Sequence, residues 1–270
     1  MKVLIFGARG YLGQYFKGQY PDAVCPSVDI GNIAAVSEVL DTENPDVVIN
    51  CAGKTGRPNV DWCEDHKTET VHSNVVGPLI LVEACEQRGI YLVHLGTGCV
   101  YTGDESHPFC ETDAPNFSGS FYSRTKGMID QLLGEFPVLN IRLRMPFDGT
   151  DNERNLINKI RKYEKLIDIP NSMTHIPEML KAVDVLIQKR KTGPYNIVNP
   201  GAISPYRIME LYKEIVDPSH AFAKFSEEEM LEITKAGRSN CILSTNKLEK
   251  EGITMMPIEE ACRTALHAMK

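Results

Sequence analysis

The sequence lacks any apolar run of the about 18 residues that a membrane-spanning helix needs, so we expect a soluble protein with no membrane contact. The apolar stretch in the opening MKVLIFGARG is too short for a signal peptide, which favours a strand there and a cytoplasmic protein. An excess of positive charge is also missing, because the formal net charge is −7. Nonspecific binding to nucleic acid needs a basic surface, so we do not expect a nucleic-acid partner.

The eight cysteines form no C-x-x-C pair, and their spacing matches no metal-binding pattern. Scattered cysteines in an enzyme-like sequence are typical of reduced thiols in the cytosol, and we expect no metal site. Hydrophobic residues make up 42% and charged residues 24% of the chain, which excludes extensive disorder.

Short apolar runs alternate with longer helical patterns in the first two-thirds of the chain. Because the apolar runs do not alternate with polar residues, they are typical of parallel strands buried on both faces. The predicted strands are Val3–Phe6, Val47–Asn50, Ile90–Leu95 and Leu139–Leu143. The predicted helices between them are Tyr11–Tyr20, Ile33–Glu43, Thr70–Gln87 and Tyr122–Glu135. This order predicts an α/β fold of the Rossmann type, a doubly wound parallel sheet.

The pattern changes after about Arg144, where helices dominate. The predicted helices there are Asn152–Lys165, Ile176–Arg190, Pro205–Val216, Glu227–Lys235 and Pro257–Met269, with one late strand at Tyr195–Val198. We therefore expect residues 1–150 to form the dinucleotide-binding domain, to which the late strand near 195–198 returns. Residues 151–270 are expected to form a smaller, mainly substrate-binding α/β part.

A glycine-rich stretch, Gly7-Ala8-Arg9-Gly10-Tyr11-Leu12-Gly13, directly follows the first predicted strand and opens the first predicted helix. Such glycines let the backbone approach a pyrophosphate, which the N-terminus of the following helix attracts. Arg9 could reach a 2′-phosphate and favour NADP, although an exposed loop arginine is the plain alternative. Asp29, the nearest acidic candidate for the ribose of NAD, could instead face the adenine, so spacing leaves the choice between NADPH and NADH open.

Tyr122 and Lys126 form a Y-x-x-x-K pair, whose side chains lie on one face of a helix. A lysine cation stabilises a phenolate and so helps a tyrosine to transfer a proton. Thr97 follows the third predicted strand, where its hydroxyl could hydrogen-bond a substrate ketone. The order glycine loop, hydroxyl, tyrosine–lysine pair predicts hydride transfer, with a solvent-facing helix pair as the alternative.

Four longer blocks resemble the extended short-chain dehydrogenases, and most closely the nucleotide-rhamnose synthase/epimerase-reductases. They are Cys51–Glu64, Pro115–Ser123, Arg161–Thr174 and Gly237–Asn240. The chain is also similar to the bacterial dTDP-4-dehydrorhamnose reductases. Gly98 stands where those reductases carry an aspartate, so their substrate contacts there do not transfer.

The resemblance implies a two-step conversion of UDP-4-keto-6-deoxy-D-glucose to UDP-β-L-rhamnose, by 3,5-epimerisation and then NADPH-dependent reduction of the C4 ketone. It implies Cys99 as the epimerase acid or base, with a small buried hydrophobe as the structural alternative. Lys159 matches the family lysine proposed as its partner, with a solvated helix lysine as the alternative. A separate 4,6-dehydratase must supply the substrate, and a homodimer is left open.

The resemblance also implies the binding residues. Those expected at the cofactor are Gly7, Arg9, Gly10, Tyr11, Leu12, Asp29, Ile30, Cys51, Ala52, Gly53, Tyr122, Lys126 and Pro146. Those expected at the substrate are Thr55, Arg57, Asn59, Cys99, Asn171, Ser172, Thr174 and Arg238, the last as a diphosphate clamp.

Two rival functions fit the same fold. One is a dTDP-4-dehydrorhamnose reductase that relies on a separate epimerase, against which Cys99 and Lys159 argue. The other is a catalytically idle, NADP-binding regulatory subunit, which the intact Thr97, Tyr122 and Lys126 disfavour.

Overall fold

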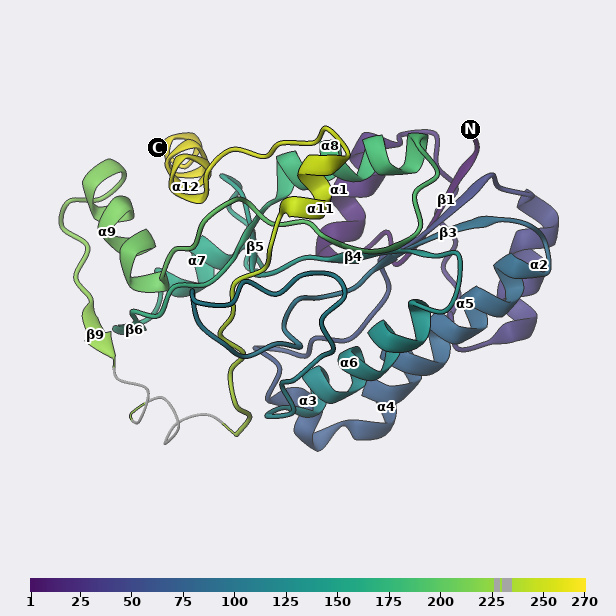
Figure 1. Ribbon diagram of the computed structural model, residues 1–270, viewed down its shortest axis with the longest axis horizontal. Helices are drawn as coiled ribbons and strands as arrows, with labels where there is room; N and C mark the ends of the chain where they lie inside the picture. The colour runs from purple at the N-terminus through teal and green to yellow at the C-terminus, as the bar shows by residue number, and fades with distance from the viewer. Residues whose placement is uncertain (226–228, 230–234) are drawn as a thin grey trace.

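The computed structural model describes residues 1–225, 229 and 235–270. A parallel sheet of five strands in the order β1-β2-β3-β4-β8 forms its centre (Figure 1). The strands are β1 (Val3–Phe6), β2 (Val47–Asn50), β3 (Tyr91–Leu95), β4 (Leu139–Arg142) and β8 (Gly193–Asn196). Val24 adds an isolated parallel bridge to Leu4, on the side of β1 away from β2. The chain thus passes to one side of β1 and then crosses to the other, which places a topological switch point at the carboxyl end of β1.

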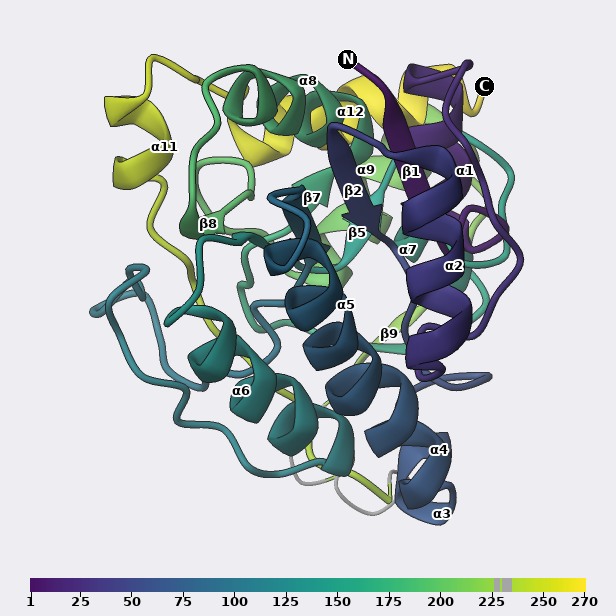
Figure 2. The ribbon, with the colours of Figure 1, turned by 90° about the vertical axis from the view of Figure 1, so that its right-hand side faces the viewer.

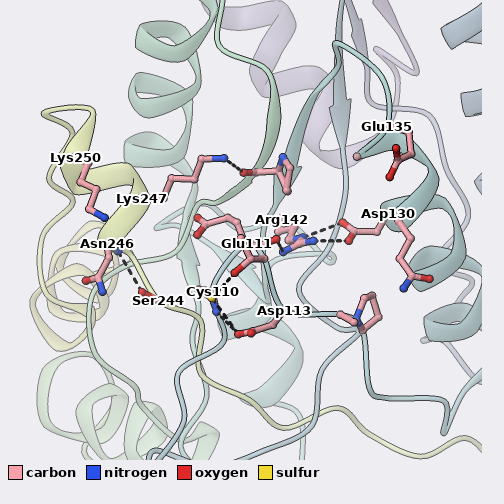
Figure 3. A pocket seen from close by; sticks show the side chains of 16 residues that line it. Cys110, Glu111, Asp113, Asp130, Glu135, Arg142, Ser244, Asn246, Lys247 and Lys250 are labelled. Carbon is pink, nitrogen blue, oxygen red and sulfur yellow. Dashed lines mark hydrogen bonds and ion pairs between the residues drawn. The ribbon is translucent and has the colours of Figure 1, made fainter.

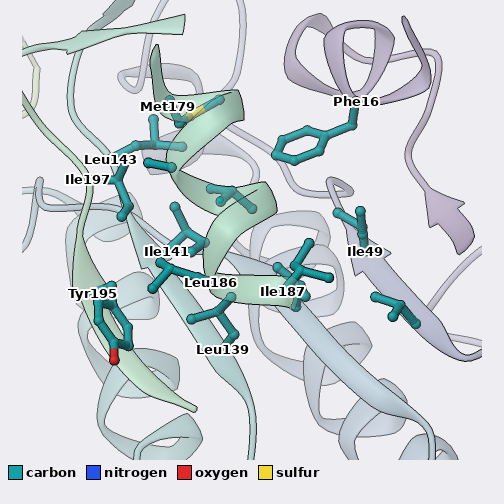
Figure 4. Close-up of a cluster of buried hydrophobic side chains, with 14 of the residues drawn as sticks. Phe16, Ile49, Leu139, Ile141, Leu143, Met179, Leu186, Ile187, Tyr195 and Ile197 are labelled. Atoms are coloured by element: carbon teal, nitrogen blue, oxygen red, sulfur yellow. The ribbon is translucent and has the colours of Figure 1, made fainter. Parts of the chain in front are cut away.

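Helices cover both faces of this sheet, as Figures 1 and 2 show. Those on one face are α1 (Tyr11–Gln19) and α8 (Ile176–Gln188), and those on the other are α2 (Ile33–Glu43), α5 (Gly77–Glu86) and α6 (Phe121–Leu133). Alternate strand residues enter opposite cores: Ile5 and Ile49 pack with Phe16 of α1 and Leu186 of α8 (Figure 4), whereas Leu4 faces the other helices. This arrangement confirms the predicted doubly wound α/β class.

A second hydrophobic core lies beyond the carboxyl edge of the sheet, on the left in Figure 1. It is built by α7 (Leu156–Ile160), α9 (Pro205–Ile215) and α12 (Ile258–Ala268) with two small sheets. These parallel pairs are β5 (Pro146–Phe147) with β7 (Thr174–His175), and β6 (Lys165–Ile167) with β9 (Ala223–Phe225). The remaining helices are α3 (Trp62–Asp65), α4 (Lys67–Val71), the π-helical turn η1 (His72–Val76) and α11 (Asn246–Lys250). The division of the chain at residue 150 stays a prediction.

The predicted helix Asn152–Lys165 is confirmed only over Leu156–Ile160, and its outer parts are wrong. Asn155 starts α7 by accepting a hydrogen bond from the Ile157 N–H, and its amide group donates to the Asp148 carbonyl, which holds the preceding residues in a turn. The helix ends at Ile160, and residues 165–167 pair with 223–225 instead. A pairing partner so distant in sequence leaves no local signal.

The predicted helix Thr70–Gln87 is also interrupted, because it contains the π turn η1 immediately before α5. Pro78, near the start of α5, has no N–H for the usual bond to the fourth residue before it, and proline at such a point disturbs the regular helical pattern. The predicted helix Glu227–Lys235 lies mostly outside the described residues. Among the helices that the structure describes, none is long and apolar enough to cross a membrane.

Candidate active site

The glycine loop lies at the switch point, between the end of β1 and the start of α1. Gly7 has φ +75°, and a Cβ added there would lie 2.5 Å from the Ala52 backbone nitrogen. The Cys51 N–H donates to the Phe6 carbonyl at 2.9 Å, so the segment after β2 lies against the loop. The structure therefore brings together residues 7–12 and 51–53, which include eight of the residues expected at the cofactor: Gly7, Arg9, Gly10, Tyr11, Leu12, Cys51, Ala52 and Gly53.

The first turn of α1, as the structure describes it, has no side-chain cap. In this described segment the N-cap is Gly10 and the first turn holds no acidic residue, whereas Ser120 caps α6 and Asn32 caps α2. Unpaired N–H groups and the positive end of the helix dipole favour an anion at such a place.

Other residues assigned to the cofactor lie in the loop itself, in the segment 29–30 and at the start of β5. The Arg9 guanidinium donates to Ser27 Oγ at 2.7 Å from an exposed position. Asp29 Oδ2 lies 3.0 Å from His72 Nε2, and its other oxygen accepts from the Gly31 N–H, so hydrogen bonds hold the pKa of Asp29 below its ordinary value. Ile30 is buried, and Pro146 begins β5.

The Y-x-x-x-K pair lies on α6, whose N-terminus Ser120 fixes by accepting from the Ser123 N–H at 3.0 Å. Tyr122 and Lys126 are both buried and lie one turn apart. Thr97 follows β3, and its Oγ1 accepts from the Cys99 N–H at 3.1 Å. The three predicted reducing residues are therefore close to one another.

Burial dominates the titration of this pair. It raises the pKa of Tyr122, an effect that the charge of Cys99 reinforces and a hydrogen bond with Thr97 opposes. Burial lowers the pKa of Lys126 to about 8, against the opposing charge of Asp130. A lysine whose pKa lies this close to neutral pH can exchange a proton with a neighbouring tyrosine.

A row of polar side chains crosses the sheet beneath α6, and sequence reasoning missed it. Asn50, His94 and Asn140 occupy one register position on β2, β3 and β4. His94 Nε2 lies 3.1 Å from Lys126 Nζ, and Asn140 donates to Asp130, which is one turn further along α6. The available signal was a lone histidine within an apolar strand, but only the register reveals its partners.

Cys99 is half-buried in a loop that Arg144 organises. Arg144 is fully buried, and its guanidinium donates to the Gly98 carbonyl at 3.0 Å and to Cys241 Sγ at 3.0 Å. A Cβ at Gly98 would lie 2.5 Å from Leu243 Cδ1 and 2.9 Å from Arg144 Cγ. The side chain of Arg144 therefore occupies the space that the aspartate of the bacterial reductases would need.

Lys159 lies on α7, half-buried, where burial and the nearby cation of Arg154 lower its pKa. Arg154, a residue that sequence reasoning missed, donates to Thr55 Oγ1 and to the Gly56 carbonyl, both at 3.1 Å. Arg57 pairs with Glu153 at 3.4 Å on the surface. Glu153 and Arg154 thus contact the predicted substrate loop at residues 55–57.

The other predicted substrate residues hold the structure together. Asn171 Oδ1 accepts from Arg144 at 2.6 Å, Ser172 Oγ accepts from the Leu243 N–H, and Thr174 Oγ1 donates to the Ile197 carbonyl. All three are buried, which gives them a supporting part here, and direct contact with a substrate stays a prediction.

Arg238 makes two hydrogen bonds to Asp61, at 2.8 and 3.1 Å, and Asp61 N–H donates to Asn59 Oδ1. A diphosphate would have to compete with this carboxylate, which the sequence did not single out. The role of Arg238 as a diphosphate clamp also stays a prediction.

Comparison with known proteins places the chain in a family. Residues 1–163 match the family model described as the RmlD substrate binding domain. A bifunctional dTDP-4-dehydrorhamnose 3,5-epimerase/dTDP-4-dehydrorhamnose reductase of Arabidopsis thaliana is 40% identical, over 96% of this chain and 90% of its own length. The chain belongs to this reductase family.

Two further relatives are similar to nearly all of this chain. The crystal structure of the L780 UDP-rhamnose synthase of Acanthamoeba polyphaga mimivirus superposes with a TM-score of 0.95, at 34% identity, over 100% of this chain and 99% of that one. A trifunctional Arabidopsis thaliana protein, UDP-glucose 4,6-dehydratase/UDP-4-keto-6-deoxy-D-glucose 3,5-epimerase/UDP-4-keto-L-rhamnose-reductase RHM1, is 38% identical over 97% of this chain. This chain spans only 41% of that protein's length.

An open cavity of about 740 Å³ has none of the predicted site residues in its lining (Figure 3). Glu111, Asp130, Arg142 and Lys247 are among its lining residues. The residues expected to do chemistry lie at the carboxyl edge of the sheet instead, and we base the function on them. In the described part of the chain, no cluster of three or more histidine, cysteine or acidic side chains could hold a metal ion.

Proposed function

We propose that this chain is a bifunctional 3,5-epimerase and NADPH-dependent 4-keto reductase that converts UDP-4-keto-6-deoxy-D-glucose to UDP-β-L-rhamnose. The observation that carries the proposal is the position of Cys99 beside the reducing pair. Its N–H donates to Thr97 Oγ1, and its charge acts on the pKa of Tyr122. A proton-transferring thiol next to a reducing tyrosine is what a combined epimerase and reductase requires.

The residues at the switch point fit a dinucleotide. The approach of Gly7 to Ala52 leaves no room for a side chain, and the N-terminus of α1 has no cap of its own. Within the described residues, the buried Tyr11 hydroxyl has no hydrogen-bond partner, so it can serve a ligand. The exposed Arg9 favours the 2′-phosphate of NADPH over NADH.

The reduction needs a hydride and a proton. NADPH, when bound, supplies the hydride to C4 of the sugar. The Thr97 hydroxyl orients the ketone, and the Tyr122 phenol gives its proton to O4. Lys126, whose pKa burial lowers to about 8, returns a proton to the phenolate.

Epimerisation must come first, because only the C4 ketone makes the C3 and C5 protons acidic. Cys99 exchanges a proton with these carbons on one face of the sugar, and Lys159 does so on the other. Burial and Arg154 lower the pKa of Lys159, which makes its amine available as a base.

The chemistry of the substrate also defines its source. A 4-keto-6-deoxy sugar arises by dehydration of a nucleoside-diphosphate hexose, so a 4,6-dehydratase must act before this chain. We propose that such an enzyme supplies the substrate. We also propose that the protein is located in the cytoplasm and forms a homodimer. The 151–270 part is proposed to bind the sugar nucleotide and the 1–150 part the cofactor.

A one-enzyme assay with NADPH and un-epimerised UDP-4-keto-6-deoxy-D-glucose in D₂O tests the proposal. NMR of the product should show UDP-β-L-rhamnose with deuterium at C3 and C5. The variant Cys99→Ala should lose the deuterium exchange yet still reduce a substrate that has already been epimerised. Tyr122→Phe should keep the deuterium exchange, whereas its reduction should be slower by about 100-fold or more.

The matched control is Cys110→Ala, a half-buried thiol in the wall of the cavity that no predicted site residue lines. It should exchange and reduce normally. The rival reductase without epimerase activity is favoured by the family match over residues 1–163, and it would leave un-epimerised substrate unchanged. Exchange at both carbons by Cys99→Ala at the normal rate would overturn the epimerase assignment, and NADPH binding without any turnover would favour a regulatory subunit.

A further inference from the structure

His94 lies beneath α6, between the side chains of Asn50 and Lys126. Asn50 Nδ2 is 3.0 Å from His94 Nδ1, and Lys126 Nζ is 3.1 Å from His94 Nε2. The histidine is 1% exposed, and burial keeps its pKa well below the ordinary value. It is therefore neutral, with one N–H and one bare ring nitrogen.

The amide of Asn50 decides which ring nitrogen carries the proton. Asn50 Oδ1 accepts from the Ala52 backbone N–H at 3.0 Å, so its NH₂ group is the one that faces the histidine. An NH₂ group can only donate, which makes His94 Nδ1 the acceptor and leaves the proton on Nε2. The reversed amide would place two donors against each other at Ala52.

The proton on His94 Nε2 points at Lys126. An ammonium group has no lone pair and would oppose that N–H at 3.1 Å, whereas a neutral amine accepts it. An amine also keeps two N–H groups, one of which can donate to the Leu95 carbonyl at 3.3 Å. The complete set of hydrogen bonds is satisfied only with Lys126 uncharged.

We propose that His94 is a positioning residue that holds Lys126 as a neutral amine in the free protein, so that Lys126 takes up a proton when the dinucleotide binds. This inference rests on the proposed function. The phosphates of the cofactor add negative charge near the site, which favours the ammonium form and releases Lys126 from His94 toward Tyr122. The lysine then carries the proton that reduction consumes.

The charges around Lys126 do not replace this control. Asp130, one turn away on α6, raises the pKa of Lys126, but its carboxylate is bound by Arg142 of β4 at 2.6 Å. On the segments packed against α6, Glu64 of α3 accepts from the Phe121 N–H, and His72 of η1 faces Asp29. Two other titratable groups near the site act on Tyr122, namely Cys63 and Cys99.

The first experiment measures the histidine tautomer in the free protein. ¹⁵N NMR of protein labelled at its seven histidines, with the His94 signals assigned by their loss in His94→Gln, should show a protonated Nε2 and a bare Nδ1. A protonated Nδ1 on His94 would overturn the proposal. This measurement needs neither cofactor nor turnover.

The second experiment measures proton uptake on binding of NADPH, by calorimetry near pH 9 in buffers of different ionisation enthalpy, because Lys126, with a pKa of about 8, is mostly neutral in the free protein at that pH. The native protein should take up about one proton per NADPH. In His94→Gln the uptake should fall to about zero, because the amide oxygen of glutamine can accept from an ammonium group before the cofactor arrives. The same substitution at the exposed His107 is the matched control and should leave the uptake unchanged.

Asn50→Asp gives an independent check if the glutamine variant does not fold. An aspartate can accept from both the Ala52 N–H and a protonated His94 Nδ1, which reverses the tautomer, so the uptake should again vanish. Native-like uptake in either folded variant would refute the role of His94. If NADPH does not bind at all, the proposed function fails, while the tautomer in the free protein still decides this inference.

Discussion

Replacing Asp130 by asparagine should unfold the protein at a clearly lower temperature. Asp130 and Arg142 are 4% and 3% exposed, and they share two hydrogen bonds, from Nε to Oδ1 at 2.9 Å and from Nη2 to Oδ2 at 2.6 Å (Figure 3). An asparagine keeps the shape of the side chain, but it removes the charge and turns an amide NH₂ toward the guanidinium or toward Asn140. Arg142 is then a buried cation that has lost its hydrogen-bonded counter-ion, and the charge of Glu111, which in the described structure makes no ion pair with it, remains nearby.

The loss of one partner from a buried ion pair costs about 3–5 kcal/mol. An unfolding entropy of about 2.1 cal/mol/K per residue gives roughly 0.6 kcal/mol per degree for this chain. We therefore expect Asp130→Asn to lower the Tm by about 5–9 °C, measured by circular dichroism or calorimetry.

Asp41 is the matched control for Asp130. It makes the same two-pronged contact with Arg88, at 2.8 and 2.9 Å, but 66% of its side chain is exposed. Solvent screens such a pair, so Asp41→Asn should leave the Tm almost unchanged. The double change Asp130→Leu with Arg142→Met should recover most of the lost stability, since it removes both buried charges. Equal shifts for the two asparagine variants, or a double variant less stable than Asp130→Asn, would refute the reasoning.

Three further outcomes follow from the same structure. A Cβ at Gly13 would lie 2.2 Å from the Gly7 carbonyl oxygen, so Gly13→Ala should cost about 1–3 kcal/mol in urea denaturation and weaken NADPH binding, whereas Gly18→Ala, in open space on the same helix, should be neutral or stabilising. The pKa of Lys126 is about 8 in the folded protein and 10.5 in the unfolded chain, so between these pH values the unfolded chain binds more protons at this residue. Lys126→Met should therefore be more stable than the native protein below pH 8. The urea midpoints of the two proteins should converge as the pH rises toward 10.5. Arg9→Ala should raise the Kd for NADPH by about 10- to 100-fold and leave that for NADH nearly unchanged, and equal losses for both cofactors would show that Arg9 does not bind the 2′-phosphate.

The strands of the large sheet could be predicted to within a few residues, because burial on both faces leaves a continuous apolar run in the sequence. β1 and β2 match their predicted ranges, and α2 begins and ends where its pattern does. The errors fall where distant segments decide the structure. Residues 165–167 form a strand only because residues 223–225 lie beside them.

The candidate site also contains residues that could be predicted from the sequence and residues that could not. The glycine loop and the tyrosine–lysine pair could be found because each works through neighbours in sequence, within one turn or one helix face. His94 and Arg144 could not, because their partners come from other strands and loops.

Arg144 illustrates why. The five hydrogen bonds of its guanidinium go to Gly98, Asn171, Ser239 and Cys241, all of them uncharged acceptors. The nearest carboxylate in sequence, Asp148, accepts hydrogen bonds from Tyr15 and Asn155 instead, and within the described residues the buried Nε of Arg144 has no partner at all. A buried cation held only by neutral groups needs all of its hydrogen bonds, so the segments that donate or accept them must keep fixed positions. These segments carry Cys99 and the predicted substrate residues. The positions of the reacting groups thus depend on a residue whose role exists only in the folded chain.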